Sequence, residues 1–374
     1  MFRVLMTADS GGGVWCYALD LARELGGQGI EVVLASMGRP LNRDQRQSIR
    51  EIPTLEVHES SYRLEWMEDP WRDVKDAGNW LLDLCEEVQP DVVHLNNYCH
   101  SYLNWHCPTL VVAHSDVYSW YRAVQHQEPD PEWQRYHEEV GAGLRAADLV
   151  VSPSRATLDN VIREYGGLER TRVIPNGRRP GIFAPNVKER MVVSVGRIWD
   201  EAKNIKALDS VAGQIDVPVF VAGANRNPDG NSTQFSNLQS LGEITPDEIA
   251  DYLSRASIYA LPAKYEPFGL SVLEAAMSGC ALVLGDIPSL RENWEHAAEF
   301  VNPNDPGSIR DVIQRLLDDG NHRNYLAGRA RERSKFFSAR RMAETYVQEY
   351  RQLMKPSLSN SQNQFLPRNL KPEF

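Results

Sequence analysis

Cysteine is scarce in this sequence, and its spacing is irregular. The 374 residues contain five cysteines, with no C-x-x-C pair among them. An odd number at such spacings suggests neither a disulfide framework nor a structural zinc site. We therefore expect a protein of a reducing compartment, the cytoplasm.

Long apolar runs and excess basic charge are missing too. Residues 1–7 are apolar over too short a stretch for a signal peptide, and no later run reaches the roughly 18 residues that a membrane span needs. Residues 1–180 contain 18 basic and 27 acidic side chains, within a chain of formal charge -11. Such an acidic first half repels phosphate backbones and anionic lipids. We expect no nucleic-acid binding and at most weak membrane association.

Short apolar runs alternate with amphipathic helical stretches, which is typical of α/β proteins whose strands are buried on both faces of a parallel sheet. The runs form two series, and the length suits roughly two domains of about 150 residues. The sequence therefore predicts two doubly wound, Rossmann-like parallel-sheet domains. The expected strands are Phe2–Thr7, Ile30–Ser36, Val92–Leu95, Leu110–His114, Leu149–Ser152 and Val173–Ile174, then Met191–Val195, Val219–Ala222, Ile258–Leu261, Ala281–Leu284 and Phe300–Val301.

A segment rich in proline and glycine, Pro175–Gly181, separates the two series and favours turns. We accordingly expect one domain over residues 1–178 and a second over 179–338. Residues 339–354 predict one more amphipathic helix. Residues 355–374 are polar and interrupted by prolines, so we expect a flexible tail there.

A glycine-rich turn, Gly11, Gly12 and Gly13, is predicted between the first strand and a helix over Val14–Leu25. Backbone N–H groups at such a turn can approach an anion closely, and the helix N-terminus adds partial positive charge. The spacing differs from the dinucleotide fingerprint, because Cys16 stands where a third glycine belongs. The turn is interpreted as a site for a phosphate or a sugar hydroxyl, or alternatively as a tight turn alone.

Two cations follow the first strand of the second series. Arg197 comes directly after the strand, and Lys203 lies six residues further on. Ligands bind at the carboxyl ends of strands in open α/β sheets, and an arginine with a lysine suits a diphosphate. The alternative is that both are ordinary solvated side chains.

The segment Tyr265–Ala276 carries two glutamates, Glu266 and Glu274, eight residues apart around a turn that leads into a helix. We expect both carboxylates to face one cleft, where a carboxylate can hold the hydroxyls of a ribose. The alternative is a solvent-facing acid on an amphipathic helix. The backbone N–H groups expected to point outward, unpaired, belong to Phe268, Gly269 and Leu270.

A histidine, His114, is predicted to close the strand Leu110–His114, again at a carboxyl end. Its alternative interpretation is a hydrogen-bonded core or rim group. Seven of the nine tryptophans precede residue 134, and their faces can stack on sugars, although packing explains most of them.

Taken together, these motifs resemble the retaining GT-B-fold glycosyltransferases of family four, and the resemblance extends from residue 1 to about 353. Its specific part is the E-x7-E segment from Glu266 to Glu274. Val173–Gly177 is similar to the family's interdomain junction, and Leu241-Gly242 falls where its nucleotide-base loop lies. The resemblance implies that the last helix crosses back to the first domain. The sequence departs from the family pattern at Arg178-Arg179-Pro180, where many relatives have an apolar residue and then an acid.

The resemblance also implies a role for each site residue. Arg197 and Lys203 neutralise the donor diphosphate, Glu274 binds the ribose, and Glu266 and His114 lie beside the transferred sugar. The backbone of Phe268, Gly269 and Leu270 holds the phosphates and sugar, and Gly11, Gly12 and Gly13 face the diphosphate and the acceptor.

The implied activity is a hexosyltransferase reaction from a nucleotide-sugar donor, UDP-linked on family frequency, to a sugar or small-molecule hydroxyl acceptor. It retains anomeric configuration by front-face attack and needs neither a metal nor a cofactor. Two alternatives stay open. One is a nucleotide-sugar epimerase or hydrolase of the same fold, and the other is a non-catalytic nucleotide-sugar-binding partner subunit.

Overall fold

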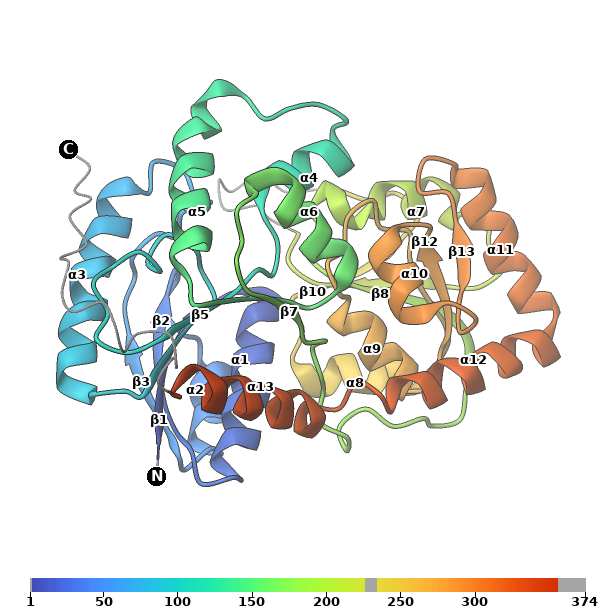
Figure 1. Ribbon diagram of the computed structural model, residues 1–374. Coiled ribbons are helices and arrows are strands. Elements are labelled where there is room, and N and C mark those ends of the chain that lie inside the picture. Colours follow the sequence, from blue (N-terminus) through green and yellow to red (C-terminus); the bar gives the residue numbers. More distant parts are fainter. Residues whose placement is uncertain (1, 226–233, 356–374) are drawn as a thin grey trace.

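The computed structural model describes residues 2–225 and 234–355, arranged as two parallel sheets covered by helices on both faces (Figure 1). The tail expected over 355–374 lies outside the described residues beyond Lys355. The first sheet has the strand order β3-β2-β1-β4-β5-β6-β7 and the second the order β10-β9-β8-β11-β12-β13. The strands are β1 Arg3–Asp9, β2 Glu31–Met37, β3 Leu55–Glu59, β4 Val92–Leu95, β5 Thr109–Val112, β6 Leu149–Ser152, β7 Thr171–Val173, β8 Glu189–Val195, β9 Val219–Ala222, β10 Gln239–Gly242, β11 Ala256–Leu261, β12 Ala281–Gly285 and β13 Glu299–Val301.

The helices connect parallel strands, as right-handed crossovers in such sheets require. Many begin with a side-chain cap: Ser154 accepts from the amide of Thr157, for example, at the start of α6. The helices are α1 Gly12–Gly26, α2 Arg43–Arg50, α3 Trp71–Val88, α4 Val117–Val124, α5 Gln134–Ala146, α6 Arg155–Tyr165, α7 Ile205–Ala212, α8 Pro246–Arg255, α9 Leu270–Met277, α10 Pro288–Trp294, α11 Pro306–Asp318, α12 Gly320–Ser334 and α13 Ala339–Leu353, with short 3-10 turns at Pro131–Trp133 and Glu201–Lys203.

The doubly wound prediction is confirmed, and every expected strand is present. Three strands have the predicted ends, and the others have ends shifted by one or two residues. Two edge strands, β3 and β10, were missed, because neither is fully buried and each carries polar residues that break the apolar run. Two local expectations were wrong. The strand β5 ends at Val112, so His114 lies in the loop beyond it, and α1 begins at Gly12, so Gly12 and Gly13 belong to the helix.

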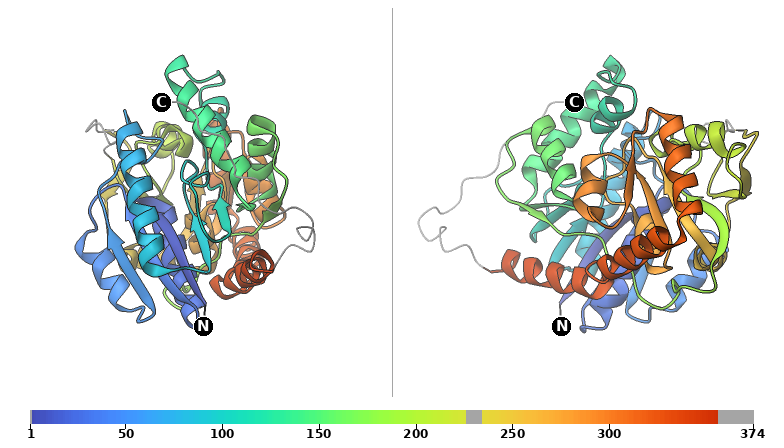
Figure 2. Two further views of the ribbon diagram at one scale, coloured as in Figure 1. Left: turned by 60° about the vertical axis from the view of Figure 1, so that its left-hand side comes forward. Right: turned by 90° about the vertical axis from the view of Figure 1, so that its right-hand side faces the viewer.

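The last helix, α13, follows the second sheet but packs against α1 of the first (Figures 1 and 2). Its residues Met342, Tyr346 and Tyr350 are buried in the same core cluster as β1 and α1. The Tyr350 hydroxyl and Nδ1 of His94 form a hydrogen bond of 2.6 Å. Burial lowers the pKa of His94 to about 3, so this ring is neutral at ordinary pH. The helix thus ties the two halves together.

No helix in the described parts of the chain combines the length and apolar character that crossing a bilayer demands.

Candidate active site

The two predicted cations lie at the carboxyl end of β8, and each is paired with a carboxylate. Lys203 Nζ lies 2.5 Å from Glu266 Oε2, and Arg197 Nη2 lies 2.8 Å from Asp200 Oδ2. The Lys203 and Glu266 side chains are only 14% and 11% exposed, so this pair is largely shielded from water. The structure therefore joins two motifs that are 63 residues apart in sequence.

Asp200, which sequence analysis did not single out, organises this cluster. Its Oδ1 accepts hydrogen bonds from the amide of Ala202 and, at 3.0 Å, from Nε1 of Trp120. Burial alone would raise the pKa of Asp200, but Arg197 and Lys203 outweigh it and hold the pKa below its ordinary value. Trp120 lies on α4 in the first half of the chain. The carboxylate that orients Arg197 is thereby bonded to the opposite domain.

The loop before α9 wraps around the carboxylate of Glu266. Glu266 Oε1 accepts from the amide of Gly269 at 2.9 Å and from that of Phe268 at 3.4 Å. The expectation that these two amides are unpaired was wrong, because the glutamate folds back on its own loop. Gly269 has φ +87°, and a Cβ there would lie 2.9 Å from Val272, so the turn requires glycine.

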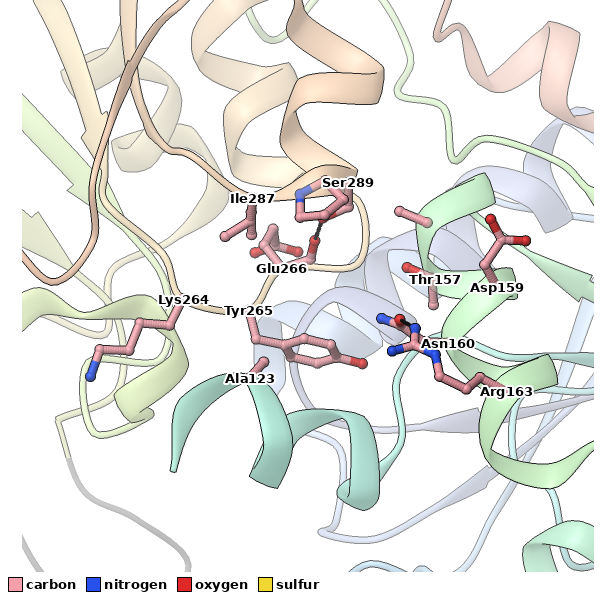
Figure 3. A pocket seen from close by; sticks show the side chains of 12 residues that line it. Ala123, Thr157, Asp159, Asn160, Arg163, Lys264, Tyr265, Glu266, Ile287 and Ser289 are labelled. Atoms are coloured by element: carbon pink, nitrogen blue, oxygen red, sulfur yellow. Dashed lines mark hydrogen bonds between the residues drawn. The ribbon is translucent and has the colours of Figure 1, made fainter. Parts of the chain in front are cut away.

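The same loop is held by side chains of the first domain. The Pro267 carbonyl accepts from Ser154 Oγ at 2.8 Å and from Thr157 Oγ1 at 3.2 Å. Figure 3 shows the Tyr265 ring pointing toward Asn160 and Arg163 of α6, with the hydrogen bond from Ser289 to the Glu266 carbonyl drawn as a dashed line. These residues line a cavity of about 300 Å³. Both domains line this cavity. It shares Glu266 with the cation cluster but includes neither Arg197 nor Lys203.

The second glutamate, Glu274, lies inside α9 and is buried. Its Oε1 lies 2.9 Å from Nε of Arg178, whose Nη1 donates to Asp20 Oδ2 at 2.6 Å. Burial raises the pKa of both Glu274 and Asp20. Burial opposes the charge on Arg178, but the two carboxylates outweigh it and raise the pKa of Arg178, so the guanidinium stays charged. Glu274 thus faces the junction between the domains rather than open solvent.

His114 is held in one tautomer by a chain of hydrogen bonds. Asn96 Nδ2 donates to the Thr7 carbonyl at 2.7 Å, which leaves Asn96 Oδ1 to accept from Nε2 of His114 at 2.8 Å. The proton therefore sits on Nε2, and Nδ1 is the acceptor. Burial lowers the pKa of His114 to about 3, so the ring is a neutral hydrogen-bonding group at ordinary pH.

The glycine-rich turn meets the start of α9. A Cβ on Gly13 would lie 3.5 Å from Leu270 Cδ1, so the first helix of one domain approaches the E-x7-E helix of the other. Asp9 closes β1 beside this turn and accepts from the Gly11 amide at 2.7 Å. Burial raises the pKa of Asp9 to about 6, although the Gly11 amide, Arg197 and Arg39 oppose the shift. The turn and the Arg197 cluster are therefore close enough to interact electrostatically.

Tertiary structure thus gathers most of the predicted residues around one interdomain junction. The residues that sequence analysis missed are supporting groups, and only Arg178 left a signal, as a departure from the family pattern. The others have ordinary sequence contexts and become visible through their contacts: Asp9, Asp20, Asn96, Trp120 and Asp200.

Comparison with known proteins gives a consistent result. The model for Glycosyltransferase Family 4 matches residues 11–180, and that for Glycosyl transferases group 1 matches residues 179–333. A D-inositol 3-phosphate glycosyltransferase of Corynebacterium diphtheriae is 23% identical, over 91% of this chain and 89% of its own. Two other curated glycosyltransferases align over only 54% and 61% of their lengths.

Solved structures share the fold. Sucrose-phosphate synthase of Thermosynechococcus elongatus superposes with a TM-score of 0.80 at 21% identity, covering 94% of this chain and 99% of that one. Anabaena HepE, solved in complex with UDP-glucose, gives a TM-score of 0.73 at 16% identity, covering 94% and 100%.

The two Rossmann-like parallel-sheet domains form a GT-B fold, shared with sucrose-phosphate synthase. The chain belongs to the family-four, group 1 glycosyltransferases, since the two models together match it from residue 11 to residue 333.

Proposed function

We propose that this protein is a retaining, metal-independent hexosyltransferase that moves a sugar from a nucleotide-sugar donor, UDP-linked in preference to other bases, to a hydroxyl acceptor. The observation that carries the proposal is the Lys203–Glu266 pair at the strand end that also carries Arg197, whose charge acts on Asp9 beside the glycine-rich turn of the other domain. A lysine and an arginine at one strand end suit a diphosphate leaving group.

The donor assignment follows from the chemistry of this cluster. Binding of the diphosphate would draw Arg197 from Asp200 and Lys203 from Glu266, and negative charge developing on the leaving group strengthens both contacts. Glu274 at the junction is the group proposed for the ribose hydroxyls. The preference for UDP is supported by the Anabaena neighbour, which was solved with UDP-glucose.

In the proposed reaction, the bond between the anomeric carbon and the diphosphate oxygen breaks while the acceptor oxygen bonds to the same face of the sugar. The acceptor proton passes to the departing phosphate oxygen. Glu266 stays paired with cation and backbone amides, which suits a group that positions the sugar rather than a covalent nucleophile. His114 accepts a hydrogen bond from a sugar hydroxyl at Nδ1. The cations supply the charge stabilisation that a metal supplies elsewhere.

The acceptor is proposed to be a sugar or small molecule, because the acidic first domain disfavours polyanions and anionic membranes. A cytoplasmic location remains a prediction. The epimerase or hydrolase alternative differs in one measurable respect, since it releases free sugar without an acceptor. A binding-only subunit is disfavoured because His114, Arg197, Lys203, Glu266 and Glu274 are all present.

The first experiment is a thermal-shift panel of UDP, GDP, ADP and their common sugar conjugates, with EDTA present. A ligand that binds the folded state raises its apparent stability with the logarithm of its concentration over its Kd. We expect a clear rise with UDP and UDP-sugars, followed by an acceptor screen in which NMR shows retained anomeric configuration. The proposal is contradicted if folded protein shows no thermal shift at millimolar ligand, or if the product has inverted anomeric configuration.

A further inference from the structure

A cluster of metal-binding side chains lies far from the proposed transfer site. Within the described ranges, one group of three possible metal ligands lies close together. It consists of Cys85, His106 and Cys107, whose ligand atoms all lie within 4.8 Å of one another. Cys85 is in the last turn of α3, whereas the other two precede β5. Their linear spacing carries no zinc motif, and tertiary packing alone brings them together.

We propose that this cluster binds one zinc ion through Cys85, His106 and Cys107. Thiolate and imidazole are the ligands that Zn²⁺ prefers in structural sites. Tetrahedral coordination at ordinary zinc distances places ligand atoms about 3.5–3.8 Å apart. Cys85 Sγ lies 3.7 Å from His106 Nδ1 and 3.9 Å from His106 Nε2, so the exposed imidazole has to turn to direct one nitrogen at the ion.

The surroundings supply a fourth ligand and an entry route. Glu86 Oε1 lies 3.9 Å from His106 Nδ1, and its side chain is 76% exposed. The carboxylate is therefore free to swing onto the fourth position. Cys85 is buried while His106 is exposed, so one side of the cluster opens to solvent. An accessible entry path and a complete ligand set are the features a metal site requires.

The location points to a structural role. His106 and Cys107 precede the amino end of β5, whereas His114 follows its carboxyl end. Seven residues of extended chain span about 20 Å, so the cluster lies about that far from His114 of the proposed transfer site. The ion would link the end of α3 to the start of β5, at the side of the first sheet remote from the second (Figure 1). The zinc site does not rest on the proposed function, and removal of zinc leaves the transfer chemistry intact.

The test uses the full chain, reduced with a phosphine and stripped by chelator, then titrated with Zn²⁺ against a chromophoric chelator. We expect one zinc per chain and at least tenfold weaker binding for Cys107→Ser and for His106→Ala. Cys280→Ser is the matched control, a buried thiol in the second domain, and binds zinc as the wild type does. His106 is exposed, so its alanine variant keeps the fold.

Cobalt substitution provides a second readout. Co²⁺ bound by thiolates gives a charge-transfer absorption, which we expect in the wild type and expect to vanish in Cys107→Ser. The proposal is overturned if the reduced wild type binds no more zinc than Cys107→Ser, or if His106→Ala binds as tightly as wild type. A disulfide between Cys85 and Cys107, with no zinc taken up after reduction, overturns it equally.

Discussion

The ammonium group of Lys203 lies 2.5 Å from Glu266 Oε2. We propose that the same group contacts the donor diphosphate during transfer. Lys203→Ala should lower kcat by about 10²–10³-fold, the cost of one preorganised charge contact to the transition state. Steady-state kinetics with the donor found in the thermal-shift panel measure this.

The matched control for Lys203 is Lys206→Ala, since Lys206 lies three residues away and is exposed on α7. Its activity should equal the wild type. Near wild-type turnover in Lys203→Ala would mean that the diphosphate lies elsewhere.

Asp9 makes stability depend on pH. Its folded pKa is about 6 against an ordinary 3.8, because burial disfavours the charged carboxylate. Well below pH 3.8 the carboxyl is neutral in both the folded and the unfolded state. Above pH 6 the folded state carries a buried carboxylate charge, which water solvates better in the unfolded state. Asp9→Asn should therefore stabilise the protein at pH 8 relative to wild type, with the advantage shrinking as pH falls from 6 to 4.

Urea denaturation at several pH values tests the Asp9 prediction, and Asp44→Asn, an exposed acid in the first turn of α2, serves as the control. An advantage of Asp9→Asn that does not change between pH 4 and pH 8 would contradict it.

At the scale of elements, Arg178 joins three segments: α1 through Asp20, the interdomain linker on which it lies, and α9 through Glu274. Arg178→Met should cost about 3–5 kcal/mol of unfolding free energy, since it leaves two carboxylates buried without a counterion. Adding Asp20→Asn and Glu274→Gln should restore much of this loss. Chemical denaturation of the single and triple variants measures both effects.

Arg179→Met is the control for Arg178, because that side chain is 42% exposed and its nearest carboxylate is 4.0 Å away. Equal stability of the two single variants would show that Asp20 and Glu274 do not depend on Arg178.

The sequence predicted the strands that are buried on both faces of their sheet. The central strands are continuous apolar runs, so β4, β6 and β9 begin and end where the pattern predicted. The edge strands β3 and β10 were not predicted, because their polar residues interrupt the apolar pattern. Glu266 and Gly269 were recognised from their motif, but the hydrogen bond between them was not, since it depends on a side chain folding back on its own loop.

At the scale of the whole molecule, both domains hold the loop that carries Glu266. Glu292 of α10 reinforces this contact by accepting the amides of Arg155 and Ala156, the first residues of α6, at 2.7 and 2.9 Å. An anion at a helix N-terminus is stabilising. Glu292→Ala should loosen this contact between the domains and weaken donor binding several-fold, with little change in the fold of either domain.

Small-angle scattering and donor titration test the Glu292 prediction. The radius of gyration should increase in Glu292→Ala and stay unchanged in Glu295→Ala, an exposed acid just beyond the same helix. Unchanged scattering together with unchanged donor affinity would show that this contact does not fix the relative position of the domains.

The sequence by itself determined the doubly wound architecture, and it predicted the linker and the candidate site residues, because apolar periodicity, glycine, proline and the E-x7-E motif are local signals. Only the tertiary structure decided which carboxylate meets which cation. Lys203 with Glu266, Arg178 with Asp20 and Glu274, and Trp120 with Asp200 are contacts between segments distant in the chain. Charge pairing across such distances depends on how the two sheets pack, and no local pattern encodes it.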